Sequence, residues 1–336
     1  MLETIWFILW GVLWAMYFVL DGFDFGIGTL MPFLAKNETD RRIMYNAQGP
    51  FWDGNEVWLI TAGGVTFAAF PEVYAVMFSQ LYTPLYLLLF ALIFRGVTFE
   101  FRHLSESPTM KKFMDICHVL GSFLPALLLG VAFSNIFMGL PLENGVSQGS
   151  FFGLLNPYAL AGGLLFVTAF CYHGAVWLAI KSPASMRQRA IRAAEEIWPA
   201  LVLLAVVFLA ASALATDLYA NYLKYPFLLF IPMIPVAGLV LTRVALGKRN
   251  LWQSWIFSAA TIFGTTAFGV AGIFPALLPS SIGPEHSVTI HNGASSPLTL
   301  QIMLGVALVM VPAIILYQAW VFKHFSFQIK EEEMIY

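Results

Sequence analysis

The stretch TIWFILWGVLWAMYFVLDGFDFGIGTLMPF, residues 4–33, contains no charged residue except Asp21 and Asp24. A helix of about 20 mostly apolar residues spans the hydrocarbon core of a bilayer. The stretch therefore predicts a membrane-spanning helix that carries two acidic side chains. No basic region precedes its apolar run and no small-residue cleavage site ends it, so we expect the helix to be kept rather than removed as a signal peptide.

The rest of the chain has a similar composition. Of its 336 residues, 59% are apolar and only 11% are charged, whereas soluble domains carry about 25% charged residues. So few charged side chains cannot cover a water-facing surface, and we expect most of the outer surface to contact membrane lipid. The net charge of −2 argues against a nucleic-acid partner, which requires a basic surface.

Nine segments are long and apolar enough to cross a membrane, and they predict an all-α polytopic helical bundle forming one integral membrane domain over residues 1–336. The segments are 4–33, 54–75, 78–97, 117–139, 154–180, 197–216, 226–245, 253–277 and 299–323. Gly63, Gly64 and Pro71 interrupt the second segment, which makes it the least regular of the nine. The connections are short, so no separate soluble domain is expected.

Lys and Arg residues predict the orientation, because loops rich in these residues stay on the cytoplasmic side. With nine spans, sixteen of the 17 Lys and Arg residues fall on one side and only Lys224 on the other. This partition predicts an external N-terminus and a cytoplasmic C-terminus. Adding or removing one span would scramble the partition, so it also supports the count of nine.

The first candidate site is the acidic pair of the opening helix. Asp21 and Asp24 are three residues apart, so they share one helix face, and about sixteen apolar residues precede them, which places them in the cytoplasmic part of the membrane. Gly22 and Gly26 form a GxxxG pair that allows a neighbouring helix to approach closely. Ionisable groups within spans are costly and are functional candidates for that reason. The structural alternative is an interfacial anchor or a packing pair.

Two further polar groups border the next two predicted spans. In GPFWDGNEVWLITAGG, residues 49–64, Asp53 could cap a helix, but capping does not explain Asn55 and Glu56 beside it. In FRGVTFEFRH, residues 94–103, Arg95 could instead extend its cation to the membrane surface. All these groups are expected at the cytoplasmic ends of the first three spans. Acidic groups with a balancing cation suit a path for protons or other cations.

Histidine and cysteine give little support for a cofactor bound by this chain. Of six histidines only His173 lies deep in a predicted span, so a pair of facing haem ligands is not supported. Cys117 and Cys171 lie in separate apolar segments, and no CxxC, HExxH or Gly-rich phosphate loop is present. We therefore expect no metal or cofactor to be ligated by this chain alone.

The motifs that carry these polar groups occur together in one protein family. The sequence resembles subunit II of the cytochrome bd-type quinol oxidases over nearly its whole length. The stretches that carry the resemblance are LDGFDFGIG (20–28), NETDRRIMYNAQGPFWDGNEVWLITAGG (37–64), FAAFPEVYA (67–75), FRGVTFEFR (94–102), GSFLPALLLGVAFSN (121–135), LLNPYALAGG (154–163), FPALLPSS (274–281), SSPLTLQIM (295–303) and VPAIILYQAW (311–320).

The resemblance implies a terminal oxidase of the prokaryotic cytoplasmic membrane, which oxidises quinol near the outer face, reduces oxygen to water and generates proton motive force. It implies an obligate partner, the haem-bearing subunit I, which would ligate two haems b and one haem d, and it leaves room for a small accessory subunit. In this family subunit II stabilises subunit I, and acidic residues of its first two spans are implicated in proton delivery from the cytoplasm.

The same resemblance extends to single residues. Asp21 and Asp24 match the acidic pair of the family's first span, Trp52 and Asp53 match its WDGN motif, and Arg95 with Glu100 match the motif that ends the third span. At two positions where family members vary, this chain has Glu56, where Gln also occurs, and Glu100, where Asp occurs. The residues expected on the proton path are Asp21, Asp24, Trp52, Asp53, Asn55, Glu56, Arg95 and Glu100.

Without the resemblance, a cation-coupled secondary transporter would be the favoured function. Transporters often show inverted repeats and broken helices near the bilayer midplane. Here the acidic residues gather toward the cytoplasmic ends of the helices and no repeat is evident. A purely structural membrane scaffold without any proton path is the third interpretation.

Overall fold

Twelve α-helices and four short strands make up the computed structural model, which describes residues 1–143, 146–330, 332 and 334–336. The helices are α1 (Leu2–Leu34), α2 (Glu38–Gln48), α3 (Trp52–Ala69), α4 (Pro71–Gln80), α5 (Tyr82–Phe101), α6 (Pro108–Met138), α7 (Pro157–Lys181), α8 (Ala184–Ala215), α9 (Ala220–Lys224), α10 (Phe230–Gly247), α11 (Leu251–Ile273) and α12 (Pro297–His324). The strands are β1 (Leu142–Glu143), β2 (Val146–Ser147), β3 (Ala276–Leu278) and β4 (Val288–Thr289).

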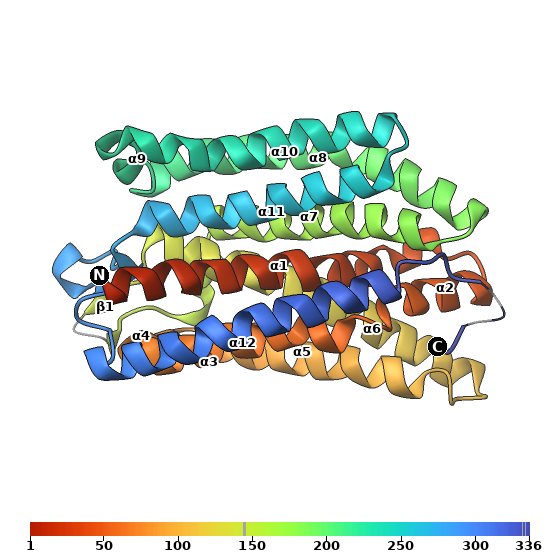
Figure 1. The fold of residues 1–336 in the computed structure, drawn as a ribbon, viewed down its shortest axis with the longest axis horizontal. Coiled ribbons are helices and arrows are strands. Elements are labelled where there is room, and N and C mark those ends of the chain that lie inside the picture. Colours follow the sequence, from red (N-terminus) through yellow and green to blue (C-terminus); the bar gives the residue numbers. More distant parts are fainter. Residues whose placement is uncertain (144–145, 331, 333) are drawn as a thin grey trace.

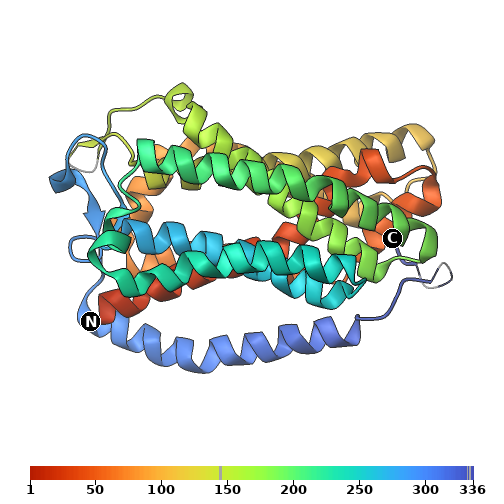
Figure 2. The same cartoon turned by 90° about the horizontal axis from the view of Figure 1, so that it is seen from above.

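The long helices lie side by side along one axis, and the two termini lie at opposite ends of the bundle (Figures 1 and 2). Eight helices within the described residues are long and apolar enough to cross a membrane. The all-α membrane architecture predicted from the sequence is therefore confirmed. The count of nine spans and the orientation of the termini stay predictions.

The predicted span 54–75 forms two helices instead of one. Helix α3 ends at Ala69, the backbone of Phe70 leaves the helical region at φ −136° and ψ 66°, and Pro71 then opens α4. Proline has no backbone N–H to continue the hydrogen-bond ladder of α3 and disfavours a helical residue before it. Ser295 satisfies two of the carbonyls left free, because its hydroxyl donates to Ala68 and its backbone N–H donates to Ala69. A loop distant in sequence thus completes the end of α3.

Several other helices begin or end away from the predicted positions. Helix α5 begins at Tyr82 rather than near residue 78, and α11 ends at Ile273, after which the chain forms strand β3. Helices α6 and α8 begin at Pro108 and Ala184, before the apolar segments predicted at 117–139 and 197–216. Hydropathy marks only the apolar part of a helix, and these helices continue beyond that part.

Helix α1 lies at the centre of the bundle, between α7 and α11 on one side and α3 and α6 on the other (Figure 1). Of its most apolar window, 72% of the residues are buried inside the protein, against 6% for α12, 11% for the span that contains α10 and 17% for α8. The outer helices therefore present apolar surface to lipid or to a partner within the membrane.

Close contact between α1 and α7 depends on glycine. A Cβ atom on Gly26 would overlap the carbonyl oxygen of Phe170, and one on Gly174 would lie 2.6 Å from the carbonyl oxygen of Phe23. The two backbones touch where a larger residue would hold them apart. The GxxxG pair predicted to admit a neighbouring helix does so here.

We expect Gly26→Ala to destabilise the folded protein, because the added methyl group can be accommodated only if α1 and α7 separate. Overpacking of this kind costs about 1–3 kcal/mol. The matched control is Gly63→Ala, since a Cβ atom at Gly63 has no neighbouring atom within 4 Å. The thermal unfolding midpoint in detergent should fall for the first variant only. Equal midpoints for the two variants would contradict this account of the packing.

Candidate functional site

The cationic centre of the site is Arg95 of α5. Its side chain is fully buried, and Nη2 donates to Asp21 Oδ1 at 2.7 Å and to Glu56 Oε1 at 2.7 Å. The guanidinium also lies 4.3 Å from the centre of the Phe25 ring. Charged hydrogen bonds to two carboxylates and an aromatic face are the partners that a buried guanidinium needs. One cation thus joins α1, α3 and α5.

Asp24 lies beside this ion pair and is held by an amide rather than a cation. Asn55 donates through Nδ2 to Asp24 Oδ2 at 2.7 Å and to the carbonyl oxygen of Leu20 at 3.0 Å. Its own oxygen accepts a hydrogen bond from Gln318 Nε2 at 2.9 Å. Because both polar ends of the amide have partners, the orientation of Asn55 is fixed. Gln318 of α12 was not among the predicted site residues.

The cluster contains three carboxyl groups and one cation. Asp21, Asp24 and Arg95 are fully buried, and the Glu56 side chain is 23% exposed. Unbalanced charge in a low-dielectric interior is costly. Proton binding by a carboxyl group reduces the excess negative charge, so the arrangement is suited to taking up and releasing protons.

The structure places the other predicted site residues outside this cluster. Trp52 is partly buried and stacks on Phe99, with ring centres 4.9 Å apart and an angle of 8° between the planes. Asp53 is exposed, and its carboxylate accepts a hydrogen bond from the backbone of Gly54. Glu100 is exposed at the end of α5. These three residues lie on α3 and α5, as parts of the cluster do, but the hydrogen bonds of the cluster given above do not involve them.

A second ionic cluster outside the spans connects α2, the end of α5 and the start of α6. Arg102 donates to both carboxylate oxygens of Glu38 at 2.9 and 3.0 Å, and its Nε donates to Asp115 at 2.6 Å. Partial burial acts to raise the pKa of Glu38, but the hydrogen bonds and charge of Arg102 outweigh it and hold that pKa below its usual value. This cluster connects α2 to the end of α5 and to the first turns of α6.

Two histidines are fully buried, one more than the sequence indicated. His118 was expected at a helix end, but it lies inside α6, where Nδ1 is 3.0 Å from Thr98 Oγ1 and Nε2 is 3.4 Å from Gln48 Nε2. His173 lies 2.6 Å from Ser258 Oγ and 3.1 Å from the carbonyl oxygen of Val19. All four ring nitrogens are engaged, so neither residue fits a haem ligand. Within the described residues, no group of three His, Cys, Asp or Glu side chains is placed to hold a metal ion.

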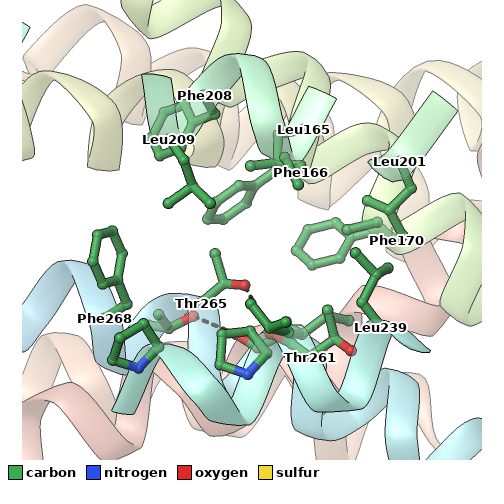
Figure 3. A pocket seen from close by; sticks show the side chains of 17 residues that line it. Leu165, Phe166, Phe170, Leu201, Phe208, Leu209, Leu239, Thr261, Thr265 and Phe268 are labelled. Carbon is green, nitrogen blue, oxygen red and sulfur yellow. Dashed lines mark hydrogen bonds between the residues drawn. The ribbon is translucent and has the colours of Figure 1, made fainter. Parts of the chain in front are cut away.

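A cavity of about 110 Å³ between α7, α8, α10 and α11 is a different kind of site (Figure 3). Its walls are mainly aliphatic and aromatic, and include Phe166, Phe170 and Phe208. The hydroxyl groups of Thr261 and Thr265 donate to carbonyl oxygens of their own helix. The cavity therefore offers no acid or base, and the buried acidic cluster is the candidate functional site.

Comparisons with known proteins show similarity to one family over almost the entire chain. The model of the family described as cytochrome bd terminal oxidase subunit II matches residues 2–325. A probable cytochrome oxidase subunit 2 from Haemophilus influenzae is 36% identical, covering 95% of this chain and 93% of the relative. The cytochrome bd-I ubiquinol oxidase subunit 2 of Escherichia coli strain K12 is 35% identical, covering 99% and 96%. The cytochrome bd ubiquinol oxidase subunit 2 of Bacillus subtilis strain 168 is 33% identical, covering 99% and 98%.

A solved structure shares the fold. A chain of the bd oxidase from Geobacillus thermodenitrificans superposes with a TM-score of 0.73 at 21% identity, covering 94% of this chain and 97% of that one. The matches extend over almost the entire sequence, and the eight candidate spans agree with a multi-pass protein of the bacterial cytoplasmic membrane. This chain therefore belongs to the cytochrome bd terminal oxidase subunit II family.

Proposed function

We propose that this subunit delivers protons from the cytoplasm to the oxygen-reducing centre of a quinol oxidase, through the buried cluster of Asp21, Asp24, Glu56 and Arg95. The observation that carries the proposal is the pair of 2.7 Å contacts by which Arg95 holds Asp21 and Glu56 inside the bundle. Three carboxyl groups around one cation form a site whose charge is adjusted by protons. Reduction of oxygen to water consumes protons, so an oxidase needs such a site.

Family membership supports the rest of the assignment. The relatives named above include ubiquinol oxidase subunits, so the chain is a component of a respiratory oxidoreductase complex. We propose that its partner is a haem-bearing subunit I with two haems b and one haem d, which supply electron transfer and oxygen reduction. We also propose that this chain stabilises that partner through the apolar outer helices, and that the complex uses quinol and generates proton motive force. A transporter is not retained, because the chain belongs to an oxidase family.

Each residue of the cluster has a distinct part in the proposed path. Glu56 is the most exposed of the three carboxyl groups and receives the proton from the cytoplasmic side. Arg95 keeps Asp21 and Glu56 within reach of each other, and Asn55 orients Asp24. The exposed carboxylates Asp53 and Glu100, with Trp52 beside them, form the approach at the surface. Uptake on the cytoplasmic side relies on the predicted orientation.

The purified complex should absorb in the red, where haem d absorbs and haem b does not. The buried histidines of this chain do not fit haem ligands, so we expect the absorbing haem to be bound by the partner subunit. The spectrum of the complex therefore tests the assignment to an oxidase. Haem should be lost from this chain when it is separated from its partner. A haem-free preparation that is active in substrate uptake would overturn the oxidase function.

Asp24→Asn should slow proton uptake while leaving the haem spectrum in place, because the amide keeps the shape of the side chain but cannot carry the proton. We expect a loss of roughly 10-fold or more, which corresponds to about 1.4 kcal/mol of barrier. Proton uptake by the complex in proteoliposomes measures the effect. The control is Asp217→Asn, since Asp217 is exposed in the connection between α8 and α9. Normal uptake by the Asp24 variant would refute the role of Asp24.

Arg95→Gln should destabilise the protein, because two carboxylates then lose their shared cation. Breaking one partner of a buried ion pair costs about 3–5 kcal/mol. Adding Asp21→Asn removes one of the uncompensated charges and should restore part of the stability, but not proton uptake. Yield of assembled complex and its thermal midpoint report stability. If the double variant is less stable than Arg95→Gln alone, the charge argument fails.

A further inference from the structure

Unpartnered buried polar atoms are concentrated along one face of α1. Among the described residues, thirteen buried side-chain nitrogen and oxygen atoms lack a hydrogen-bond partner. Seven of them belong to six residues in the acidic cluster and in the helix segments next to it. They are Trp14 Nε1, Tyr17 Oη, Asp21 Oδ2, Asp24 Oδ1, Trp58 Nε1, Arg95 Nε and Arg95 Nη1.

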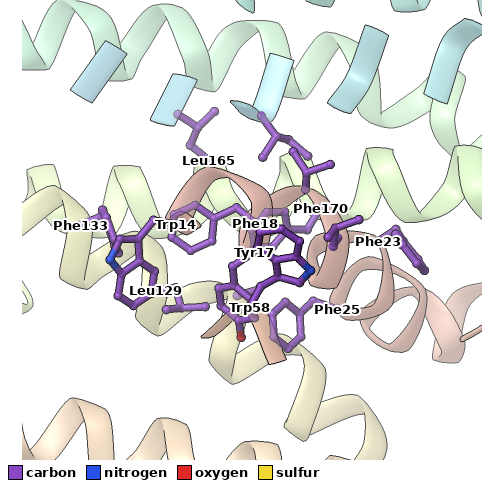
Figure 4. Packing of buried hydrophobic residues seen from close by; sticks show 14 of the residues in the cluster. Trp14, Tyr17, Phe18, Phe23, Phe25, Trp58, Leu129, Phe133, Leu165 and Phe170 are labelled. Carbon is purple, nitrogen blue, oxygen red and sulfur yellow. The ribbon is translucent and has the colours of Figure 1, made fainter. Parts of the chain in front are cut away.

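These side chains form a continuous row rather than scattered sites. Residues 14, 17, 21 and 24 follow one another at spacings of three or four, so they share one face of α1. The Trp14 and Tyr17 rings are 6.3 Å apart, as are the Tyr17 and Phe25 rings (Figure 4). The row from Asp24 to Trp14 is about 15 Å long at 1.5 Å per residue. Tyr17 lies near the middle of α1, which spans Leu2–Leu34.

Helix α3 supplies Trp58 to the row, and helix α5 supplies Arg95. Asn55 bonds to the carbonyl oxygen of Leu20, and Thr66 bonds to Trp10, so the two helices run antiparallel in a fixed register. In that register Trp58 lies opposite Tyr17. Trp58 is 4% exposed and Tyr17 is fully buried.

Three other buried indoles have hydrogen-bond partners, whereas Trp255 Nε1, which lies outside the row, has none among the described residues. Trp6 donates to the carbonyl oxygen of Leu300, Trp10 to Thr66 and Trp177 to the carbonyl oxygen of Ala47. An unsatisfied buried polar group costs about 1–3 kcal/mol. A bound water molecule removes this cost when two to four polar groups surround it. The row offers donors from Trp, Tyr and Arg beside acceptors from Asp, which is the mixture that water needs.

We propose that this face of α1 holds a chain of bound water molecules, which runs from Asp24 and Asp21 past Tyr17 to Trp14. The water chain extends the buried cluster to the middle of the membrane-spanning part. The Tyr17 hydroxyl accepts a proton from one water and donates its own to the next, so that protons pass inward without a charged side chain. This relay role rests on the proposed function, whereas the water site stands on the unpartnered atoms alone.

Radiolytic labelling of the intact complex tests the water site, because hydroxyl radicals made from bound water modify the side chains next to it. Trp14, Tyr17 and Trp58 should be labelled. The controls are Trp6 and Tyr222, each 2% exposed, whose polar atoms donate to carbonyl oxygens of Leu300 and Phe268. Labelling of the row that does not exceed labelling of the controls would overturn the proposal.

Tyr17→Phe tests the relay. The variant keeps the ring and loses only the hydroxyl beside Asp21, so it should assemble normally, with an unchanged haem spectrum, while proton uptake falls roughly 5-fold, about 1 kcal/mol of barrier. Tyr222→Phe is the matched control and should keep normal uptake. The same assay on Asp24→Asn separates the two proposals. Slow uptake with Asp24→Asn but normal uptake with Tyr17→Phe overturns the relay alone, and normal uptake with both overturns the proposed proton path together with the relay.

Discussion

A buried cation in a membrane protein must find all its partners within the protein, because lipid offers none. Arg95 meets this constraint in part, since Nη2 binds two carboxylates from two other helices and the guanidinium faces the Phe25 ring, whereas Nε and Nη1 have no hydrogen-bond partner among the described residues. The register of α1, α3 and α5 follows from those contacts. The opposite face of α1 is then free for the glycine contact with α7, since residues 22 and 26 lie roughly 150° around the helix from residues 21 and 24 at 100° per residue. The central position of α1 therefore depends on the Arg95 contacts at one face and on the glycine contact with α7 at the other.

The all-α membrane architecture was predictable because lipid imposes a simple pattern on the sequence. Apolar length predicted the helices, and the position of Pro71 indicated where the second segment is irregular. Helix periodicity also explains which predicted site residues meet. Glu100 is five residues beyond Arg95, about 140° around α5, and Asp53 lies about 160° around α3 from the buried Asn55. Both therefore face outward. Sequence proximity and the motifs of the resemblance had grouped them with the buried residues.

The residues that sequence reasoning missed depend on tertiary contacts. Gln318 bonds to Asn55 across 263 positions of sequence, and no local pattern predicts that partner. The same holds for Ser295, which completes the end of α3 from a distant loop. His118 did leave a local signal. Asp115, His118 and Ser122 follow one another at spacings of three and four, which marks one polar face of α6.

The shared cation gives the cluster a direction as well as a position. Exposure falls from the surface residues Asp53 and Glu100 to Glu56 at 23% and then to Asp21 and Asp24, which are fully buried. Because Glu56 and Asp21 bind the same nitrogen of Arg95, the contact of the guanidinium with one carboxyl group depends on its contact with the other. In the proposed proton path, the outer and inner carboxyl groups are therefore coupled through one guanidinium.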